Sequence, residues 1–88
     1  MNATKNTINL SNDEALLLQQ ISENGEDDIA GLASGLRMSR RRVAQQIERL
    51  KEKKLVTIKA SYDDLWVRAS RRGSQLVHYL WPEMVTAY

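Results

Sequence analysis

Three consecutive arginines, Arg40 to Arg42, are the residues whose type and spacing most clearly suggest chemistry. They follow Ser39 in the segment MSRRRVAQQIERL. The dipole of a helix favours acidic side chains in its first turn and basic ones in its last. A first turn with arginines and no acid costs roughly 0.3 kcal/mol or more per charge. The pattern therefore indicates a negatively charged partner, such as the phosphate backbone of a nucleic acid.

The spacing of apolar residues predicts that this segment forms an amphipathic helix over residues 39–53, with Ser39 as its N-cap. The buried stripe of this helix is expected to consist of Val43, Ile47 and Leu50. The far side of the helical wheel carries polar side chains, namely Arg41, Arg42, Gln45 and Arg49. Arginine recognises guanine, and glutamine recognises adenine, through paired hydrogen bonds in the major groove. We therefore expect the helix to read double-stranded DNA. A structural or protein-binding face is the alternative interpretation.

Two basic residues that come later, Lys59 and Arg68, are suited to contacts with DNA phosphates. The Ser39 hydroxyl and the free N–H groups of the first helical turn can also take a phosphate oxygen. The complete predicted set of DNA-binding residues is Ser39, Arg40, Arg41, Arg42, Gln45, Gln46, Arg49, Lys59 and Arg68. Two acidic residues on the same helix, Glu48 and Glu52, reduce its positive charge. Either can pair with a Lys or Arg side chain one turn away on this helix.

The first of the elements that must position these residues is a helix over about residues 12–23. Ser11 and Glu14 form a capping-box pattern at its start, and Gly25 supplies the left-handed residue that ends it. The residues before it, 1–10, are mostly polar, and we expect them to form a flexible N-terminus.

A second, shorter helix is predicted to follow. Asp27 or Asp28 caps its start, and Gly35 with Leu36 closes it. The residues GLRMS then leave room only for a turn before the arginine-bearing helix begins. Two helices joined by so short a turn are typical of a helix-turn-helix.

The period of the pattern changes after residue 53. Apolar and polar residues alternate from Val56 to Ile58 and from Leu65 to Ala69, with a polar stretch between them, which predicts a β-hairpin. Ser70 can cap a last helix over about residues 71–88, which Pro82 breaks or kinks.

This order of elements predicts a winged helix-turn-helix. The fold class is mainly α with a small β-hairpin, and it consists of a three-helix core, a wing and a C-terminal helix. A length of 88 residues gives room for one modest hydrophobic core. We therefore expect residues 11–88 to form a single winged-helix domain.

The overall composition narrows the possible functions. The net charge of +2 conceals an asymmetry, because residues 37–72 hold twelve basic side chains against four acidic ones, as a polyanion-binding surface requires. There is no cysteine and one histidine, which leaves few routes to a metal site. We find no paired nucleophile and base, no phosphate loop and no apolar run of about 18 residues that could span a membrane. The expectation is a cytoplasmic protein without enzymatic activity, metal or cofactor.

The segments DIAGLASGLRMSRRRVAQQIERLKEKKLV and WVRASRRGSQLV resemble the winged-helix core of MarR-type bacterial transcription regulators. The family pattern has an acidic cap, Ile or Leu with Ala, a Leu before the turn, then Ser-Arg and Val. The residues that fall on the pattern are Asp28, Ile29, Ala30, Leu36, Ser39, Arg40, Val43, Leu50, Leu55, Ser70 and Gly73. The resemblance covers about residues 10–80 and implies a DNA-binding winged helix.

The chain departs from the family pattern in three respects. Lys54 stands where the family usually has the Gly of a left-handed turn. The wing tip ASYDDL is acidic, and the family's wing-tip arginine is replaced around Leu65. The chain is also shorter than most members, which dimerise through long helices outside the core. Because the wing lacks the family's arginine, its insertion into the minor groove is not expected.

The last predicted helix carries more apolar residues than a monomer needs to cover one stripe. We expect it to form a two-fold symmetric homodimer, and the predicted interface residues are Leu76, Leu80, Trp81, Met84 and Val85. The expected function is sequence-specific binding of double-stranded DNA by a transcription regulator, with repression as the expected mode and no effector identified. The alternative is a winged helix that serves as a protein-interaction module in a larger assembly.

Overall fold

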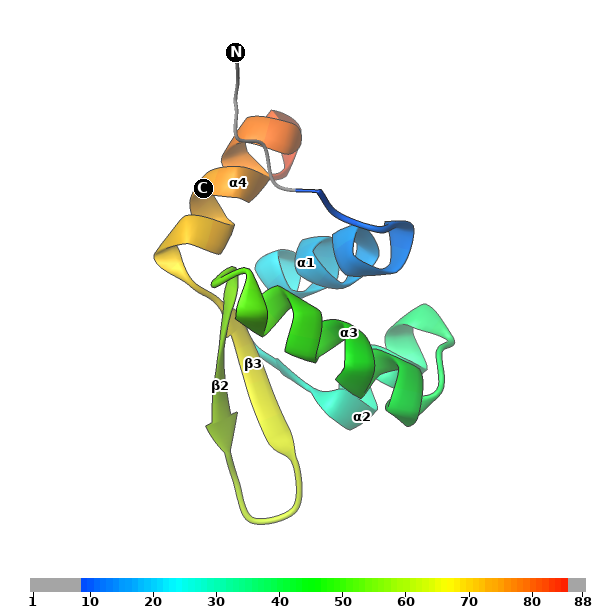
Figure 1. The fold of residues 1–88 in the computed structure, drawn as a ribbon. Coiled ribbons are helices and arrows are strands. Elements are labelled where there is room, and N and C mark those ends of the chain that lie inside the picture. Colours follow the sequence, from blue (N-terminus) through cyan, green and yellow to red (C-terminus); the bar gives the residue numbers. More distant parts are fainter. Residues whose placement is uncertain (1–8, 86–88) are drawn as a thin grey trace.

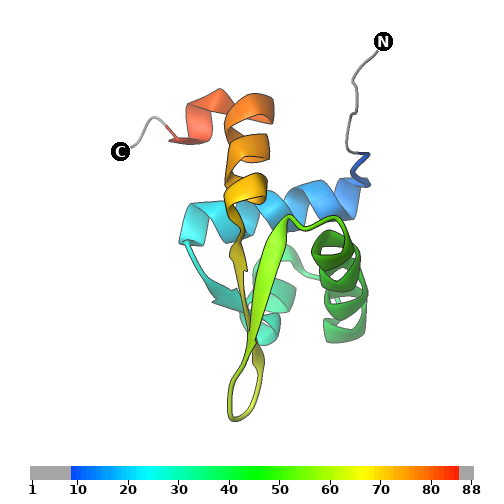
Figure 2. The same cartoon turned by 60° about the vertical axis from the view of Figure 1, so that its left-hand side comes forward.

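The computed structural model describes residues 9–85, except the side chains of Met84 and Val85. Its elements, in chain order, are α1 (Asn12–Asn24), β1 (Asp27–Asp28), α2 (Ile29–Leu36), α3 (Arg40–Glu52), β2 (Val56–Ala60), β3 (Leu65–Ala69), α4 (Arg71–Leu80) and the 3-10 helix η1 (Pro82–Val85). The β2–β3 hairpin extends below the helices, and α4 lies at the opposite end of the molecule (Figure 1 and, turned by 60°, Figure 2). The predicted winged helix-turn-helix is confirmed.

The helices begin where their capping residues predict. Ser11 and Glu14 form the complete capping box, because the hydroxyl accepts the Glu14 N–H and the carboxylate accepts the Ser11 N–H. Asp28, Ser39 and Ser70 each accept a backbone N–H from the first turn of the helix that follows. The polar residues that interrupt the apolar pattern therefore fix where α1, α2, α3 and α4 start.

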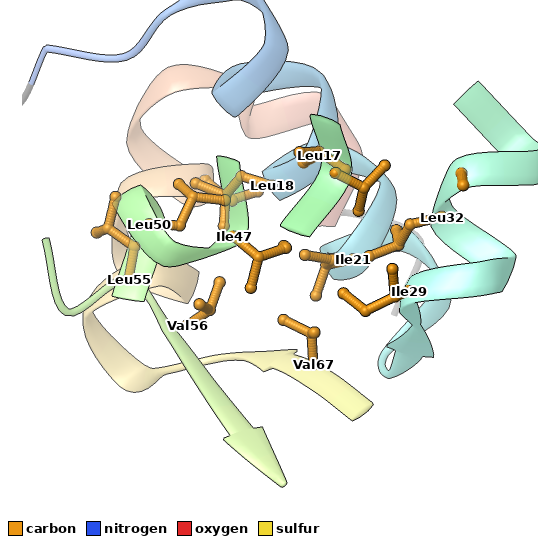
Figure 3. Close-up of a cluster of buried hydrophobic side chains, with 13 residues drawn as sticks. Leu17, Leu18, Ile21, Ile29, Leu32, Ile47, Leu50, Leu55, Val56 and Val67 are labelled. Carbon is orange, nitrogen blue, oxygen red and sulfur yellow. The ribbon is translucent and has the colours of Figure 1, made fainter. Parts of the chain in front are cut away.

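One hydrophobic core holds the three helices against the sheet (Figure 3). Helix α1 contributes Leu17, Leu18 and Ile21, and α3 contributes the predicted stripe of Val43, Ile47 and Leu50. The residues Ile29, Leu32, Ala33, Leu55, Val56, Val67 and Val77 complete this core. Helix α3 buries only this one stripe, and polar side chains cover most of its remaining surface.

The sheet has three strands, where the sequence predicted a hairpin of two. The strand order is β1-β3-β2, and both pairs are antiparallel. The added strand β1 contains only Asp27 and Asp28, which pair with Val67 and Trp66. Two acidic residues carry no alternating apolar signal, so the sequence pattern gave no indication of this strand.

The C-terminal helix is shorter than predicted, which corrects the expected range of 71–88. Helix α4 ends at Leu80, and Trp81 has φ −135° and ψ 71°, outside the helical region. Proline lacks an N–H and disfavours helical geometry in the residue before it, so Pro82 ends α4 and opens η1. Residues 86–88 lie outside the described part of the chain.

The start of α4 is joined closely to the loop that follows α3. Ser70 donates from its hydroxyl to the Lys54 carbonyl and from its N–H to the Leu55 carbonyl. A Cβ atom at Gly73 would overlap the Leu55 carbonyl oxygen, so glycine is required there. Lys54 has a left-handed φ of 64°, as the departure from the family's glycine predicted.

The N-terminal segment is tied to the domain earlier than expected. Leu10 packs against the core, and the Asn9 carbonyl accepts a hydrogen bond from Lys53 at 2.5 Å. The expected flexible N-terminus of residues 1–10 therefore does not extend to these two residues, while residues 1–8 lie outside the described range.

Candidate nucleic-acid interface

Helix α3 is the second helix of the helix-turn-helix, and it lies beside the hairpin (Figure 1). It packs against α1, α2 and β2. Its first turn contains the three arginines and no acid, with Ser39 as the N-cap. The positive end of the helix dipole and the guanidinium groups therefore lie at the same end of α3.

The middle arginine, Arg41, is exposed and is not held by the protein itself. Within residues 9–85 its side chain makes no hydrogen bond or ion pair. Gln45 and Arg49 are exposed and equally without a side-chain partner in this range. These three side chains are therefore available to an external ligand.

Arg42 differs from Arg41 because it is paired with the first helix. Its Nε lies 2.7 Å from one Asp13 carboxylate oxygen, and its second guanidinium nitrogen donates to the other oxygen at 2.9 Å. This two-point contact raises the pKa of the Arg42 guanidinium. The helical wheel placed Arg42 on the outward side, but the structure shows that it turns toward α1, although 55% of its side chain remains exposed.

Arg40 is held from the other direction, by the wing. Its guanidinium lies 3.7 Å from the Asp64 carboxylate, which also accepts the N–H groups of Ala30 and Leu65. Burial alone would raise the pKa of Asp64, but the N–H groups and the Arg40 charge outweigh it and lower this pKa. Asp64 therefore joins three elements, the wing, the start of α2 and the start of α3.

The far end of α3 is also attached to α1. Lys53 donates to both carboxylate oxygens of Glu14, at 3.0 and 2.8 Å, and Glu14 is only 2% exposed. Burial by itself would raise the pKa of Glu14, but the hydrogen bonds from Lys53 and Ser11 lower it below its usual value. Acids on two other elements thus fix both ends of α3.

Gln46 does not lie on the reading face that the sequence predicted for it. Its side-chain oxygen is buried and has no hydrogen-bond partner among the described residues. The residue stands one turn from Arg42 and two turns from Lys53, on the side of α3 that faces α1. We therefore remove Gln46 from the candidate contacts with DNA.

A hollow of about 560 Å³ separates the start of α3 from the tip of the wing. The α3 side is lined by Arg40, Arg41 and Ala44, and the wing side by residues 61–65. Asp64 is only 9% exposed, because it turns toward α2 and α3. The acidity of the wing tip that the sequence suggested is therefore reduced to Asp63 at its surface.

Lys59 and Arg68 lie on a different surface from α3. Val56 and Val67 point into the core, so the alternation of side chains directs Lys59 and Arg68 to the opposite, outer face of the sheet. Trp66 lies on this face too and is the cross-strand partner of Lys59. The structure therefore divides the predicted DNA-binding residues into two groups that face different directions.

The predicted dimer residues are also divided. Leu76 and Trp81 pack against the protein's own core, whereas Leu80 is exposed. Tyr79, which the prediction did not include, is 81% exposed. Met84 and Val85 lie in η1, and their side chains are outside the description.

The acids that hold α3 were not recognised in the sequence. Asp13 stands 29 residues before Arg42, which it contacts, and Asp64 stands 24 residues after its partner Arg40. Periodicity within an element cannot identify such pairs, because they form only when the core brings the elements together. The one available signal was the capping box, which singled out Glu14 but not its second role.

The described residues contain no group of three or more His, Cys, Asp or Glu side chains that could hold a metal ion. None of the helices in this range combines the length and the apolar character that crossing a membrane requires. His78 is exposed on α4.

Comparison with solved structures identifies the same fold in bacterial regulators. BpsR of Bordetella bronchiseptica, whose DNA binding is regulated by 6-hydroxynicotinic acid, matches with a TM-score of 0.76 and 20% identity over 89% of this chain. The transcriptional regulator SlyA matches with a TM-score of 0.74 and 18% identity over 83% of the chain. AbsC, a MarR family transcriptional regulator from Streptomyces coelicolor, matches with a TM-score of 0.67 and 22% identity over 86% of the chain.

These matches confirm the resemblance to MarR-type winged-helix proteins at the level of the fold. The chain spans only 60% of the length of BpsR and 54% of that of SlyA and of AbsC. No protein-family model matches the sequence, and no curated protein matches it either.

Proposed function

We propose that this protein is a transcription regulator that binds double-stranded DNA and inserts α3 into the major groove. The observation that supports this most strongly is the group of unpaired polar side chains on the outward side of α3, Arg41, Gln45 and Arg49. Their side chains suit the edges of guanine and adenine. They stand on α3, a helix of 13 residues whose apolar stripe is buried in the core.

The three neighbouring arginines then have different roles. Arg41 contacts bases, because nothing in the described part of the protein holds it. Arg40 and Arg42 lie beside it, but Asp64 and Asp13 hold them, so they contribute less than Arg41 to the contact with DNA. The Ser39 cap and the free N–H groups of the first turn of α3 contact a phosphate between them.

Repression is the simplest mode of action for such a protein. A regulator that occupies a promoter blocks other proteins by its volume alone and needs no contact beyond those with DNA. The names of SlyA and AbsC describe them as transcriptional regulators, which is consistent with this class of function.

Selection from random duplex DNA tests the proposal. We expect one enriched sequence motif, and we expect the logarithm of the binding constant to fall linearly with the logarithm of salt concentration, by about 0.9 for each phosphate contact. Absence of binding to any duplex at low salt would contradict the function. The winged helix would then serve as a protein-interaction module that presents its basic face to an acidic partner.

We further propose that the protein acts as a homodimer through the end of α4. Tyr79 and Leu80 are exposed there, next to Trp81. Two-fold pairing would double the contacts of one helix-turn-helix over half-sites about one DNA turn apart. Light scattering at tens of micromolar protein should give twice the mass of the chain, and Tyr79→Glu should return it to the monomer mass.

A further inference from the structure

The outer face of the sheet carries a second set of unpaired cationic side chains. Lys59 on β2 lies directly across from Trp66, and Arg68 stands two residues after Trp66 on β3. Neither cation forms an ion pair with any residue in the range 9–85. Like the outward side of α3, this face therefore has charges that the fold itself does not neutralise.

Trp66 gives this face an apolar centre. It is 36% exposed, although it is the largest side chain of the sheet, because it points away from the core that contains Val67. Tryptophan is among the residues that contribute most to binding at protein interfaces. A partner with an apolar side chain would remove the rest of its ring from water.

One hollow borders Trp66, and a second borders Arg68. The first, of about 220 Å³, is lined by Glu26, Lys59, Ser61 and Trp66. The second, of about 270 Å³, lies between Arg68, the end of α1 and α4, and His78 and Ser74 are on its wall. The Ser22 hydroxyl in the second hollow is buried without a hydrogen-bond partner in the described structure. It can donate to an acceptor that enters there.

We propose that this outer face binds an extended acidic peptide segment of a partner protein. The spacing agrees with this partner, because Arg68 stands two residues from Trp66 along β3, about 7 Å away, and alternate side chains of an extended peptide have the same separation. An apolar side chain of the peptide lies on Trp66, a carboxylate two positions away meets Arg68, and the Lys59 ammonium, across from Trp66, attracts the second carboxylate. The inference is independent of the proposed contact between α3 and DNA.

The charges at the edge of this face favour a peptide over a single-stranded nucleic acid. Platforms for single strands combine aromatic rings with a continuous positive groove. Here Glu26 lines the same hollow as Lys59 and Trp66, so a phosphate chain across the tryptophan would meet a carboxylate. A peptide avoids this repulsion, because it can place an uncharged residue at that point.

The proposal can be tested by NMR titration of the ¹⁵N-labelled protein with the peptide acetyl-Gly-Glu-Ser-Leu-Ser-Glu-Gly-amide. We expect the indole signal of Trp66 and the backbone signals of Lys59 and Arg68 to shift, while the indole signal of Trp81 stays in place. Trp66→Ala and Arg68→Glu should each weaken peptide binding by about tenfold or more. Arg72→Glu, the same charge change on the exposed start of α4, should leave it unaltered.

Several results would overturn the proposal. They are an absence of shifts at millimolar peptide, peptide binding that survives Arg68→Glu, and shifts of the same signals by the oligonucleotide dT10 but not by the peptide. A loss of duplex affinity in Arg68→Ala as large as that in Arg41→Ala would assign this arginine to DNA instead. Trp66→Ala should leave duplex binding unchanged, and the dispersion of each variant's spectrum reports whether it is folded.

Discussion

The two polar sides of α3 are alike in charge but differ in what neutralises it. The side toward α1 carries Arg42 and Lys53, and carboxylates of α1 pair with both. The outward side carries Arg41 and Arg49, and within residues 9–85 no acid pairs with either. The first side fixes the position of the helix, and the second remains unpaired among the described residues.

This difference teaches that a cluster of positive charge in a sequence is not by itself a binding surface. The Glu14–Lys53 pair is a structural contact, because Glu14 is buried and its carboxylate also accepts the Ser11 N–H in the capping box of α1. Arg41 has no such contact, although it differs from Arg42 by only one position. The interpretation of each basic residue therefore depends on the acids that the fold brings near it.

The largest effect should come from the buried acid on the α1 side. Glu14→Ala removes the capping box and leaves Lys53 without its partner, so we expect the free energy of unfolding to fall by roughly 2–3 kcal/mol. Urea unfolding measures this loss. Glu14→Gln, which keeps the size and one acceptor, should lose about half as much. A loss below about 0.5 kcal/mol in Glu14→Ala would show that the contact behaves as a surface pair.

On the outward side, Arg41→Ala should weaken binding to a selected duplex by about 1–3 kcal/mol. The reason is the loss of paired hydrogen bonds to a base edge, and the preference for the base at that position should relax as well. Fluorescence anisotropy measures the affinity. The free energy of unfolding should not change, because Arg41 has no partner in the described structure. Equal affinity of variant and parent would remove Arg41 from the interface.

A smaller effect should follow when a paired residue is released. Asp13→Asn removes the carboxylate that holds Arg42, which becomes free to contact a phosphate. We expect duplex affinity to rise about two- to fivefold and the salt dependence to steepen by about one counterion. Glu23→Gln removes an equal charge from an exposed position of α1 and serves as the control. A rise of the same size in both variants would point to general electrostatics instead of Arg42.

The smallest effect concerns acid stability. The pKa of Glu14 is lowered in the folded protein from its usual value of 4.5, so its stabilising contribution is complete above that pH. The contribution is lost as the pH falls from 4.5 through the lower folded-state pKa. We expect the difference in unfolding free energy between the parent and Glu14→Gln to be constant near neutral pH and to shrink below pH 4.5. A difference that grows on acidification would contradict this sign.

Local signals in the sequence were sufficient to predict most of the fold. The caps Ser11, Ser39 and Ser70 predicted the starts of three helices, and the apolar stripe of α3 predicted its buried face. The second helix was expected to be capped by Asp27 or Asp28, and Asp28 is the cap. These features act within one or two turns of the chain. The end of α4 was placed too far along, although Pro82 signalled the break.

The candidate site could be predicted only in part. Which of its basic residues are paired depends on contacts with acids that are distant in the sequence. The sequence identified α3 and its arginines, but Arg42 is oriented by Asp13 and Arg40 by Asp64, which are remote in the chain. In the same way, β1 depends on its pairing with β3 and not on its own residues. The direction in which Lys59 and Arg68 point required the register of the hairpin.

The most direct test of the difference between Arg41 and Arg42 is to observe their side chains in the presence of DNA. Guanidinium Nε–H signals of both arginines can be followed by NMR while a selected duplex is added. A large shift of the Arg41 signal is expected, with a smaller one for Arg42, which Asp13 already binds at two points. An unchanged Arg41 signal together with a shifted Arg42 signal would contradict the account.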